Sequence, residues 1–150
     1  MKEKKTFLGL DLGEKTLGVA ISEFGIIACN LKTIYFSPYK YEELWKPLEK
    51  IIKNFKVKIV VLGFPKHMNN DLGIKAQISL YFKKKMNFLF NSVQVVLWDE
   101  RLSTKQSIQI LLQNKRNRKK RLKLKNEISA VVILQNFLNY YQNNYYIGKE

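Results

Sequence analysis

The chain has 150 residues, 46% of them hydrophobic, which favours a single domain with its own core. Its 27 basic residues against 12 acidic ones give a formal net charge of +15, which favours a polyanionic partner such as nucleic acid. The absence of a run of about 18 apolar residues, the charged start and the lone Cys29 argue against a membrane span, a signal peptide and an internal disulfide, so we expect a cytoplasmic protein with no membrane partner.

The first 36 residues predict three antiparallel strands. Residues 7–22 form two apolar runs joined by a glycine-containing turn, and the first run ends on Asp11. Residues 25–36 are rich in β-branched and aromatic side chains, which predicts a third strand. We expect these strands to form a meander.

Asp11 is the only acid in a run that otherwise looks buried, and two interpretations of it stay open. In the first, Asp11 starts the turn, its side chain bonds to the backbone two residues on, and Gly13 supplies a positive φ. In the second, Asp11 lies at the mouth of a sheet as a ligand for a hard cation, while Gly13 and Gly18 let a phosphate-bearing partner approach the backbone.

Changes in the hydrophobic period predict two helices and two more strands. A helix is expected from about Tyr41, and Pro47 predicts that it begins late or bends. The apolar run 58–63 predicts a central strand, parallel to the first because a helix connects them. A last strand over 93–98 leads into an acidic pair. The inward-facing residues of the two helices are expected to be Leu44, Leu48, Ile51, Ile52, Phe55, Ile78, Phe82, Met86 and Leu89.

The remaining segments include a loop, two helices and a basic block. Turn-forming residues predict a loop over 64–73, where the sole histidine is expected to be solvated. A capping-box spacing predicts a third helix from Ser103. A mobile basic loop is expected at about 114–125, with eight of the 27 basic residues and no acid. A general excess of lysine does not explain such a cluster. The final helix is expected from about Asn126, with Ala130, Leu134, Phe137, Leu138 and Tyr141 facing the core.

This order of elements predicts an α/β domain with a mixed five-stranded sheet, an antiparallel three-strand meander plus two parallel strands, flanked by helices. In such sheets functional groups gather beyond the strand ends. Asp11 ends the first strand, Glu100 follows the last, and Asn126 and Glu127 open the final helix. If these positions converge, their oxygens suit Mg²⁺ or Mn²⁺, and such ions promote phosphodiester hydrolysis.

Several short motifs occur in order along nearly the whole chain. They are Gly9-Leu10-Asp11-Leu12-Gly13-Glu14-Lys15, Gly18-Val19-Ala20-Ile21-Ser22, Val61-Leu62-Gly63-Phe64-Pro65, Trp98-Asp99-Glu100-Arg101-Leu102-Ser103-Thr104 and Ile133-Leu134-Gln135. In this order and at this spacing they resemble the YqgF/RuvX family. That resemblance implies an RNase H-like fold; members of the family are described as Holliday junction resolvases and as nucleases that process the 5′ end of precursor 16S rRNA.

By this resemblance Asp11 and Glu100 are metal ligands. The family's last acid is an aspartate near the start of the final helix, where this chain has Asn126, followed by Glu127. The basic residue that commonly follows Lys15 in the family is here Thr16.

Asn126 therefore has three interpretations. It caps the final helix without any chemistry, it ligates the metal weakly through its amide oxygen, or Glu127 takes over as the ligand, although Glu127 is rotated by about 100° around the helix. We hypothesise that Glu127 substitutes. Asp99 and Glu100 should point to opposite sides of their strand, so at most one of them faces the metal.

Nucleic acid is the expected partner, held through backbone charge that RNA and DNA share. Cutting a symmetric junction would favour a homodimer. The candidate contacts are Lys15, Arg101, Lys115, Arg116, Arg118, Lys119, Lys120 and Arg121.

The favoured interpretation is a metal-dependent nuclease of one domain spanning residues 1–150, and only the family resemblance favours pre-16S rRNA as its substrate. The alternatives are a resolvase of four-way DNA and a nucleic-acid-binding protein with a degenerate metal site. The first motif also resembles the phosphate loop of actin- and sugar-kinase-like ATPases, but those proteins need two such domains and this chain supplies one.

Overall fold

The computed structural model describes residues 5–65, 70–99 and 117–147. Its centre is a five-stranded sheet. Strands β1 (Thr6–Leu12), β2 (Thr16–Ser22) and β3 (Cys29–Tyr35) form an antiparallel meander, and β4 (Val57–Phe64) and β5 (Gln94–Asp99) run parallel to β1. The strand order is β3-β2-β1-β4-β5, which confirms the mixed sheet expected from the sequence.

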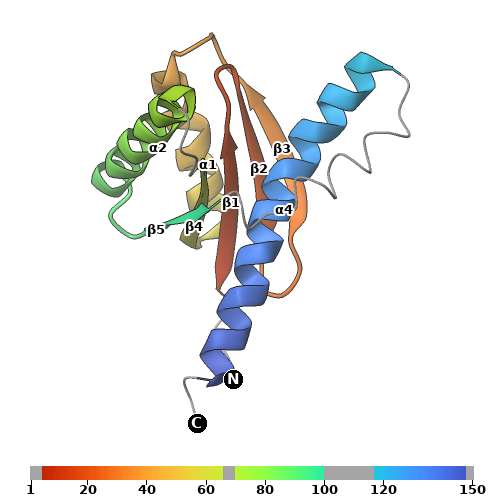
Figure 1. The fold of residues 1–150 in the computed structure, drawn as a ribbon. Coiled ribbons are helices and arrows are strands. Elements are labelled where there is room, and N and C mark those ends of the chain that lie inside the picture. Colours follow the sequence, from red (N-terminus) through yellow and green to blue (C-terminus); the bar gives the residue numbers. More distant parts are fainter. Residues whose placement is uncertain (1–4, 66–69, 100–116, 148–150) are drawn as a thin grey trace.

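Helices cover both faces of the sheet (Figure 1). A 3₁₀ turn, η1 (Tyr41–Leu44), leads into α1 (Trp45–Phe55), which with α2 (Asn70–Leu89) lies on one face, while α4 (Arg118–Ile147) crosses the other. Pro47 is the third residue of α1, where its missing N–H has no intrahelical partner to lose. The late start of this helix is therefore confirmed.

Two hydrophobic clusters follow from the alternation of side chains along the strands. Leu8 and Leu10 of β1 pack in the cluster under α1 and α2, and Phe7 packs in the cluster under α4. The α4 cluster contains all the residues that were expected to face inward from the final helix. Within the described ranges, no helix is long and apolar enough to cross a membrane.

Three expectations differ from the structure. The final helix begins at Arg118, so residues 118–125 are helical and not a loop, and Asn117 accepts a bond from the Lys119 N–H at 2.9 Å as its cap. Helix α2 begins at Asn70, inside the expected loop. Leu89, expected to face inward, is 41% exposed as the last residue of α2. The helix expected from Ser103 lies outside the described residues.

Candidate active site

Asp11 lies next to the end of β1, opposite Gly18 of β2. Because Asp11 and Phe7 share one face of the strand, the Asp11 side chain is on the α4 side of the sheet. The chain turns only after Asp11, where the Gly13 N–H donates to the carbonyl of Thr16 at 2.8 Å, and among described glycines only Gly25 has a positive φ. The interpretation of Asp11 as the start of a turn with Gly13 at positive φ is therefore wrong.

Two glycines bring α4 directly onto the backbone of the sheet. A Cβ on Gly18 would lie 2.8 Å from the backbone oxygen of Asn126 and 3.6 Å from the Cβ of Asp11, and a Cβ on Gly9 would lie 2.6 Å from the Cβ of Leu134. No side chain fits in these gaps. The helix, and not a phosphate-bearing partner, occupies the space over Gly18, so that part of the second interpretation is also wrong.

The carboxyl group of Asp11 is poorly solvated and surrounded by groups that favour its charged form. Burial raises its pKa above the ordinary value, while the charge of Lys125, a hydrogen bond with the Ser129 hydroxyl and the charge of Lys75 lower it. Burial has the largest effect. The site is thus a desolvated acid that two lysines and a hydroxyl partly compensate.

Ser129 was not singled out by the sequence reasoning. It is buried on α4, its hydroxyl donates to the backbone oxygen of Lys125 at 2.7 Å, and it lies close enough to Asp11 to lower the pKa of that carboxyl group. The available signal was its position three residues after Asn126, on a helix face otherwise made of Ala130, Ile133 and other apolar residues.

The first turns of α4 separate the two candidates for the last ligand. Asn126 comes one turn before Ser129 and Ala130, on the same side of the helix, and its backbone lies over Gly18. Glu127 is two residues from Ser129, or about 200° around the helix. Asn126 lies eight residues inside the helix, so the interpretation as an N-cap is wrong.

Strands β4 and β5, parallel to β1, end at the same edge of the sheet as Asp11 and provide the remaining residues there. Trp98 of β5 lies on the α4 side, with its ring centroid 5.6 Å from that of Phe137, whereas Asp99 lies on the opposite face. Strand β4 lies between β1 and β5. Its residue at this position is Gly63, which pairs with Trp98 and, as a glycine, adds no side chain to the site. Glu100 lies outside the described residues.

The described part of the chain offers oxygen ligands for a hard cation, but only two residues provide them at this site. The desolvated Asp11 carboxyl group and the Asn126 amide on the adjacent helix turn fit the oxygen preference of Mg²⁺ or Mn²⁺. Within residues 5–65, 70–99 and 117–147, no three His, Cys, Asp or Glu residues group as metal ligands. A second carboxylate would have to come from elsewhere in the chain.

The candidate nucleic-acid contacts fall into two groups. Lys15 is exposed in the turn between β1 and β2, and the exposed Arg118, Lys119, Lys120 and Arg121 form the first turn of α4. This end of α4 extends past the sheet on the side of the β1–β2 turn (Figure 1). Arg101, Lys115 and Arg116 lie outside the described residues.

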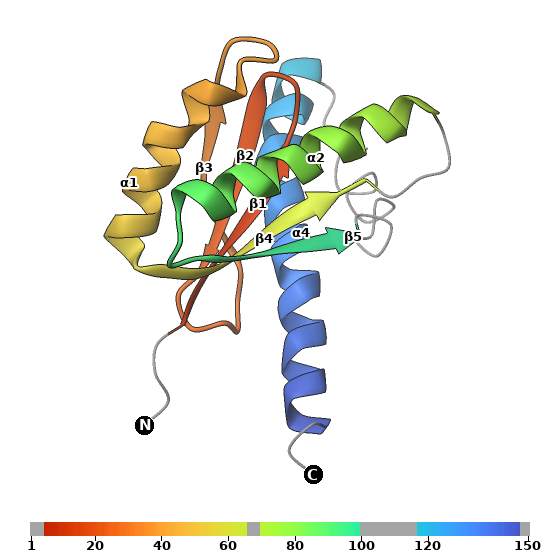
Figure 2. The same ribbon diagram turned by 90° about the vertical axis from the view of Figure 1, so that its left-hand side faces the viewer.

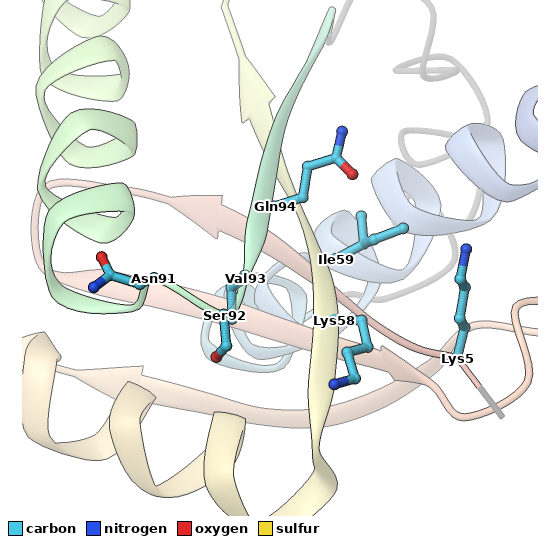
Figure 3. Close-up of a pocket in the computed structure, with 7 residues that line it drawn as sticks. All are labelled: Lys5, Lys58, Ile59, Asn91, Ser92, Val93 and Gln94. Atoms are coloured by element: carbon cyan, nitrogen blue, oxygen red, sulfur yellow. The ribbon is translucent and has the colours of Figure 1, made fainter. Parts of the chain in front are cut away.

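A separate cavity of about 400 Å³ lies at the other end of the sheet (Figure 3). Its lining includes Lys5, Lys58 and Gln94, at the starts of β1, β4 and β5. Lys58 precedes Gly63 by five strand residues, about 16 Å, so this cavity is remote from Asp11. It is not the candidate active site.

Comparisons with known proteins find relatives that match most of the chain, among them the following two. A protein of Aster yellows witches'-broom phytoplasma (strain AYWB), named "Putative pre-16S rRNA nuclease", is 60% identical over 133 residues, or 89% of this chain and 88% of that protein. A protein of the same name from Geobacillus sp. (strain WCH70) is 44% identical over 133 residues, 88% of this chain and 96% of the relative.

The fold is similar to that of a solved RuvC structure. The structure of T. thermophilus RuvC in complex with a Holliday junction substrate matches 91% of this chain and 95% of its own, with a TM-score of 0.60 and 16% identity. This likeness confirms the RNase H-like fold. A family model described as "RuvX: Holliday junction resolvase" matches residues 5–140, so the chain belongs to the RuvX family.

Proposed function

We propose that this protein is a metal-dependent nuclease that hydrolyses phosphodiester bonds of pre-16S rRNA in the cytoplasm, as one domain. The observation that carries the proposal is the desolvated Asp11 carboxyl group at the carboxyl edge of β1, directly beneath α4. Its support is the 60% identity to a relative named as such a nuclease and membership of the RuvX family.

In this proposal Asp11 and Glu100 hold Mg²⁺ or Mn²⁺. Asp99 faces away from Asp11, so it is not assigned to the metal. Asn126 or Glu127 supplies the last oxygen, and helix geometry favours Asn126 because it shares a side of α4 with Ser129. A bound divalent cation supplies Lewis acidity that activates water and stabilises the leaving oxygen.

The basic residues hold the substrate. Lys15 and the first turn of α4 flank the edge where Asp11 lies, so their charges bind backbone phosphates on both sides of the reacting one. Arg101, Lys115 and Arg116 are proposed to add to this surface. Because phosphate contacts carry no sequence information, cleavage should follow the shape of the substrate more than its sequence.

The proposal is tested by incubating the purified protein with end-labelled pre-16S rRNA and Mg²⁺ or Mn²⁺. Cleavage should appear, stop on addition of EDTA and be lost in Asp11→Asn. Glu42→Gln is the control, because Glu42 is an exposed carboxylate in η1 and should leave the rate unchanged. Equal cleavage by Asp11→Asn would remove this site from the reaction.

A four-way DNA junction is the second candidate substrate, because the matching family model is described as a Holliday junction resolvase. The same assay with labelled junction DNA compares the cleavage rates of the RNA and DNA substrates. Preference for the junction by a factor of about 10 or more, equivalent to about 1.4 kcal/mol in transition-state binding, would assign the protein to DNA and would call for a homodimer.

Loss of the metal site is the third possibility, and Asn126 is the residue that raises it. A neutral amide holds a cation less firmly than a carboxylate does. Asn126→Asp should therefore lower the Mg²⁺ concentration needed for half-maximal cleavage. Cleavage by Asn126→Asp alone, with none by the natural chain, would make the protein a binding protein with a degenerate site.

A further inference from the structure

The outward side of α2 bears a line of exposed apolar side chains. Ile74, Tyr81 and Phe88 are 62%, 58% and 76% exposed and follow each other at intervals of seven residues. Such an interval returns to nearly the same side of a helix, so the three side chains form one ridge about 21 Å long. Single exposed apolar residues are ordinary, but three of them along one side of a helix indicate a binding surface.

The charge of the helix restricts what binds there. Residues 73–89 contain four lysines and no acid. Lys84 is exposed beside the ridge, and the Lys85 ammonium lies 5.8 Å from the centroid of the Phe88 ring. A second copy of the chain docked on the ridge would bring Lys84 and Lys85 against the same two lysines, which is repulsive. A polyanion with flat apolar surfaces complements both the charges and the rings.

The start of α2 lies near the candidate active site. On the opposite side of α2, Ser79, Phe82 and Met86 are buried against the sheet. Lys75 lies one turn before Ser79 on that same side and acts electrostatically on Asp11. In Figure 2 the start of α2 lies toward the tips of β4 and β5, and the helix runs from there across the sheet. A strand leaving the Asp11 edge could therefore follow α2.

We propose that the outer side of α2 binds an unpaired nucleic-acid strand that continues from the strand cut at Asp11. Its bases stack on Tyr81 and Phe88, and its phosphates pair with Lys84 and Lys85. Aromatic rings beside lysines are the usual means of holding unpaired strands without reading their sequence. The inference rests on the proposed nuclease function and adds that the substrate has a single-stranded segment next to the cut.

Binding is measured in EDTA, where no cleavage occurs, with a fluorescein-labelled RNA of ~12 nucleotides that cannot pair with itself and with a blunt RNA duplex. Tyr81→Ala/Phe88→Ala should weaken binding of the unpaired strand by at least about 10-fold, because both stacking surfaces are lost. Duplex binding should be unchanged. Tyr81→Phe/Phe88→Tyr keeps both rings and should bind as the natural chain does.

Tyr35→Ala is the matched control, since Tyr35 is a 68% exposed aromatic residue on β3, on another part of the surface. Full affinity of Tyr81→Ala/Phe88→Ala for the unpaired strand would overturn the inference and leave the ridge to a protein partner with acidic side chains. Equal weakening by Tyr35→Ala would also overturn it. Strand binding through α2 by a protein that cleaves no substrate would support this inference and contradict the nuclease function.

Discussion

Asp11 is placed where its charge is unfavourable unless a cation accompanies it. Burial raises its pKa, and Lys125, Ser129 and Lys75 only partly offset that effect. A carboxyl group that must bind a cation tightly gains from poor solvation, because water competes less for the ion. Without the ion, the same poor solvation reduces the stability of the fold.

The first prediction follows from this conflict. In EDTA at neutral pH, Asp11→Asn should melt at a higher temperature than the natural chain, because it removes a desolvated charge. The folded pKa of Asp11 lies above its unfolded value, so the natural chain gains stability as the pH falls through the folded pKa. The advantage of Asp11→Asn should therefore shrink toward about pH 4, the unfolded value.

Thermal unfolding followed by circular dichroism between neutral and acidic pH measures this difference. Glu42→Gln serves as the control, because an exposed carboxylate should give no gain in melting temperature. A lower melting temperature for Asp11→Asn at neutral pH would mean that the lysines more than compensate the burial.

At this scale the sequence identified the acid but not its surroundings. Asp11 can be recognised in the sequence because a carboxylate in an apolar strand is costly to bury unless a cation or a hydrogen-bond donor accompanies it. Ser129 is not visible, because a serine on a helix is common and only the packing of α4 brings it to Asp11. Gly18 was assigned to a phosphate for the same reason: a glycine reveals that something comes close, but not whether it is a ligand or a helix.

Among the elements, α4 determines the site, because its distance from β1 and β2 sets how close Ser129 and Asn126 come to Asp11. The second prediction is that Gly18→Ala destabilises the fold by about 1–3 kcal/mol, since the new Cβ would lie 2.8 Å from a backbone oxygen of α4 that cannot move alone. The proposed cleavage should slow as well. Urea unfolding measures the free energy.

Gly73→Ala is the control, because a Cβ there meets nothing within 4 Å and the residue lies in a helix. It should stabilise the protein by about 0.5–1 kcal/mol, since alanine restricts the unfolded chain and favours helix. If Gly18→Ala were as stable as the natural chain, α4 would not be fixed by this contact.

Gln135 fixes the other half of α4 to the loop between β2 and β3. Its side chain accepts from the Ala28 N–H at 2.8 Å and donates to the Ile26 carbonyl at 3.0 Å. The third prediction is that Gln135→Leu costs about 1–3 kcal/mol, because a partly buried backbone group loses its partner. Gln142→Leu, which removes one bond to the Gly25 carbonyl, should cost less in the same urea titration.

The strands and the apolar faces of the helices could be predicted from hydrophobic period, but the start of α4 could not. Residues 118–125 were expected to be a loop because like charges repel in a block. Lysine, arginine and leucine are nevertheless good helix formers, and the helix spreads these charges around its circumference. With Asn117 as a cap and the helix anchored on the sheet further along, local propensity prevails over repulsion.

For the whole molecule, the arrangement of charge matters more than its total. Cationic side chains from three elements converge on the carboxyl edge of β1: Lys15 from the β1–β2 turn, Lys75 from α2 and Lys125 from α4. Arg118 and its neighbours extend this cationic surface along α4 beyond the sheet. The cut phosphate would thus lie inside a basic surface formed by several elements.

The fourth prediction uses the salt dependence of nucleic-acid binding to distinguish direct contacts with this surface from a general effect of the excess of lysine. Replacing Arg118, Lys119, Lys120 and Arg121 by alanine should make the slope of log affinity against log salt shallower by about 3, because each phosphate contact contributes about 0.7–0.9. Replacing the exposed Lys40, Lys46, Lys50 and Lys53 removes the same charge from α1 and from the residue before η1, on the opposite face from α4. That variant should keep the natural slope, since long-range attraction is screened within about 10 Å at 0.1 M salt. Fluorescence anisotropy with a labelled RNA duplex in EDTA measures both slopes. Equal slopes for the two variants would mean that the nucleic acid responds to net charge alone and does not contact α4.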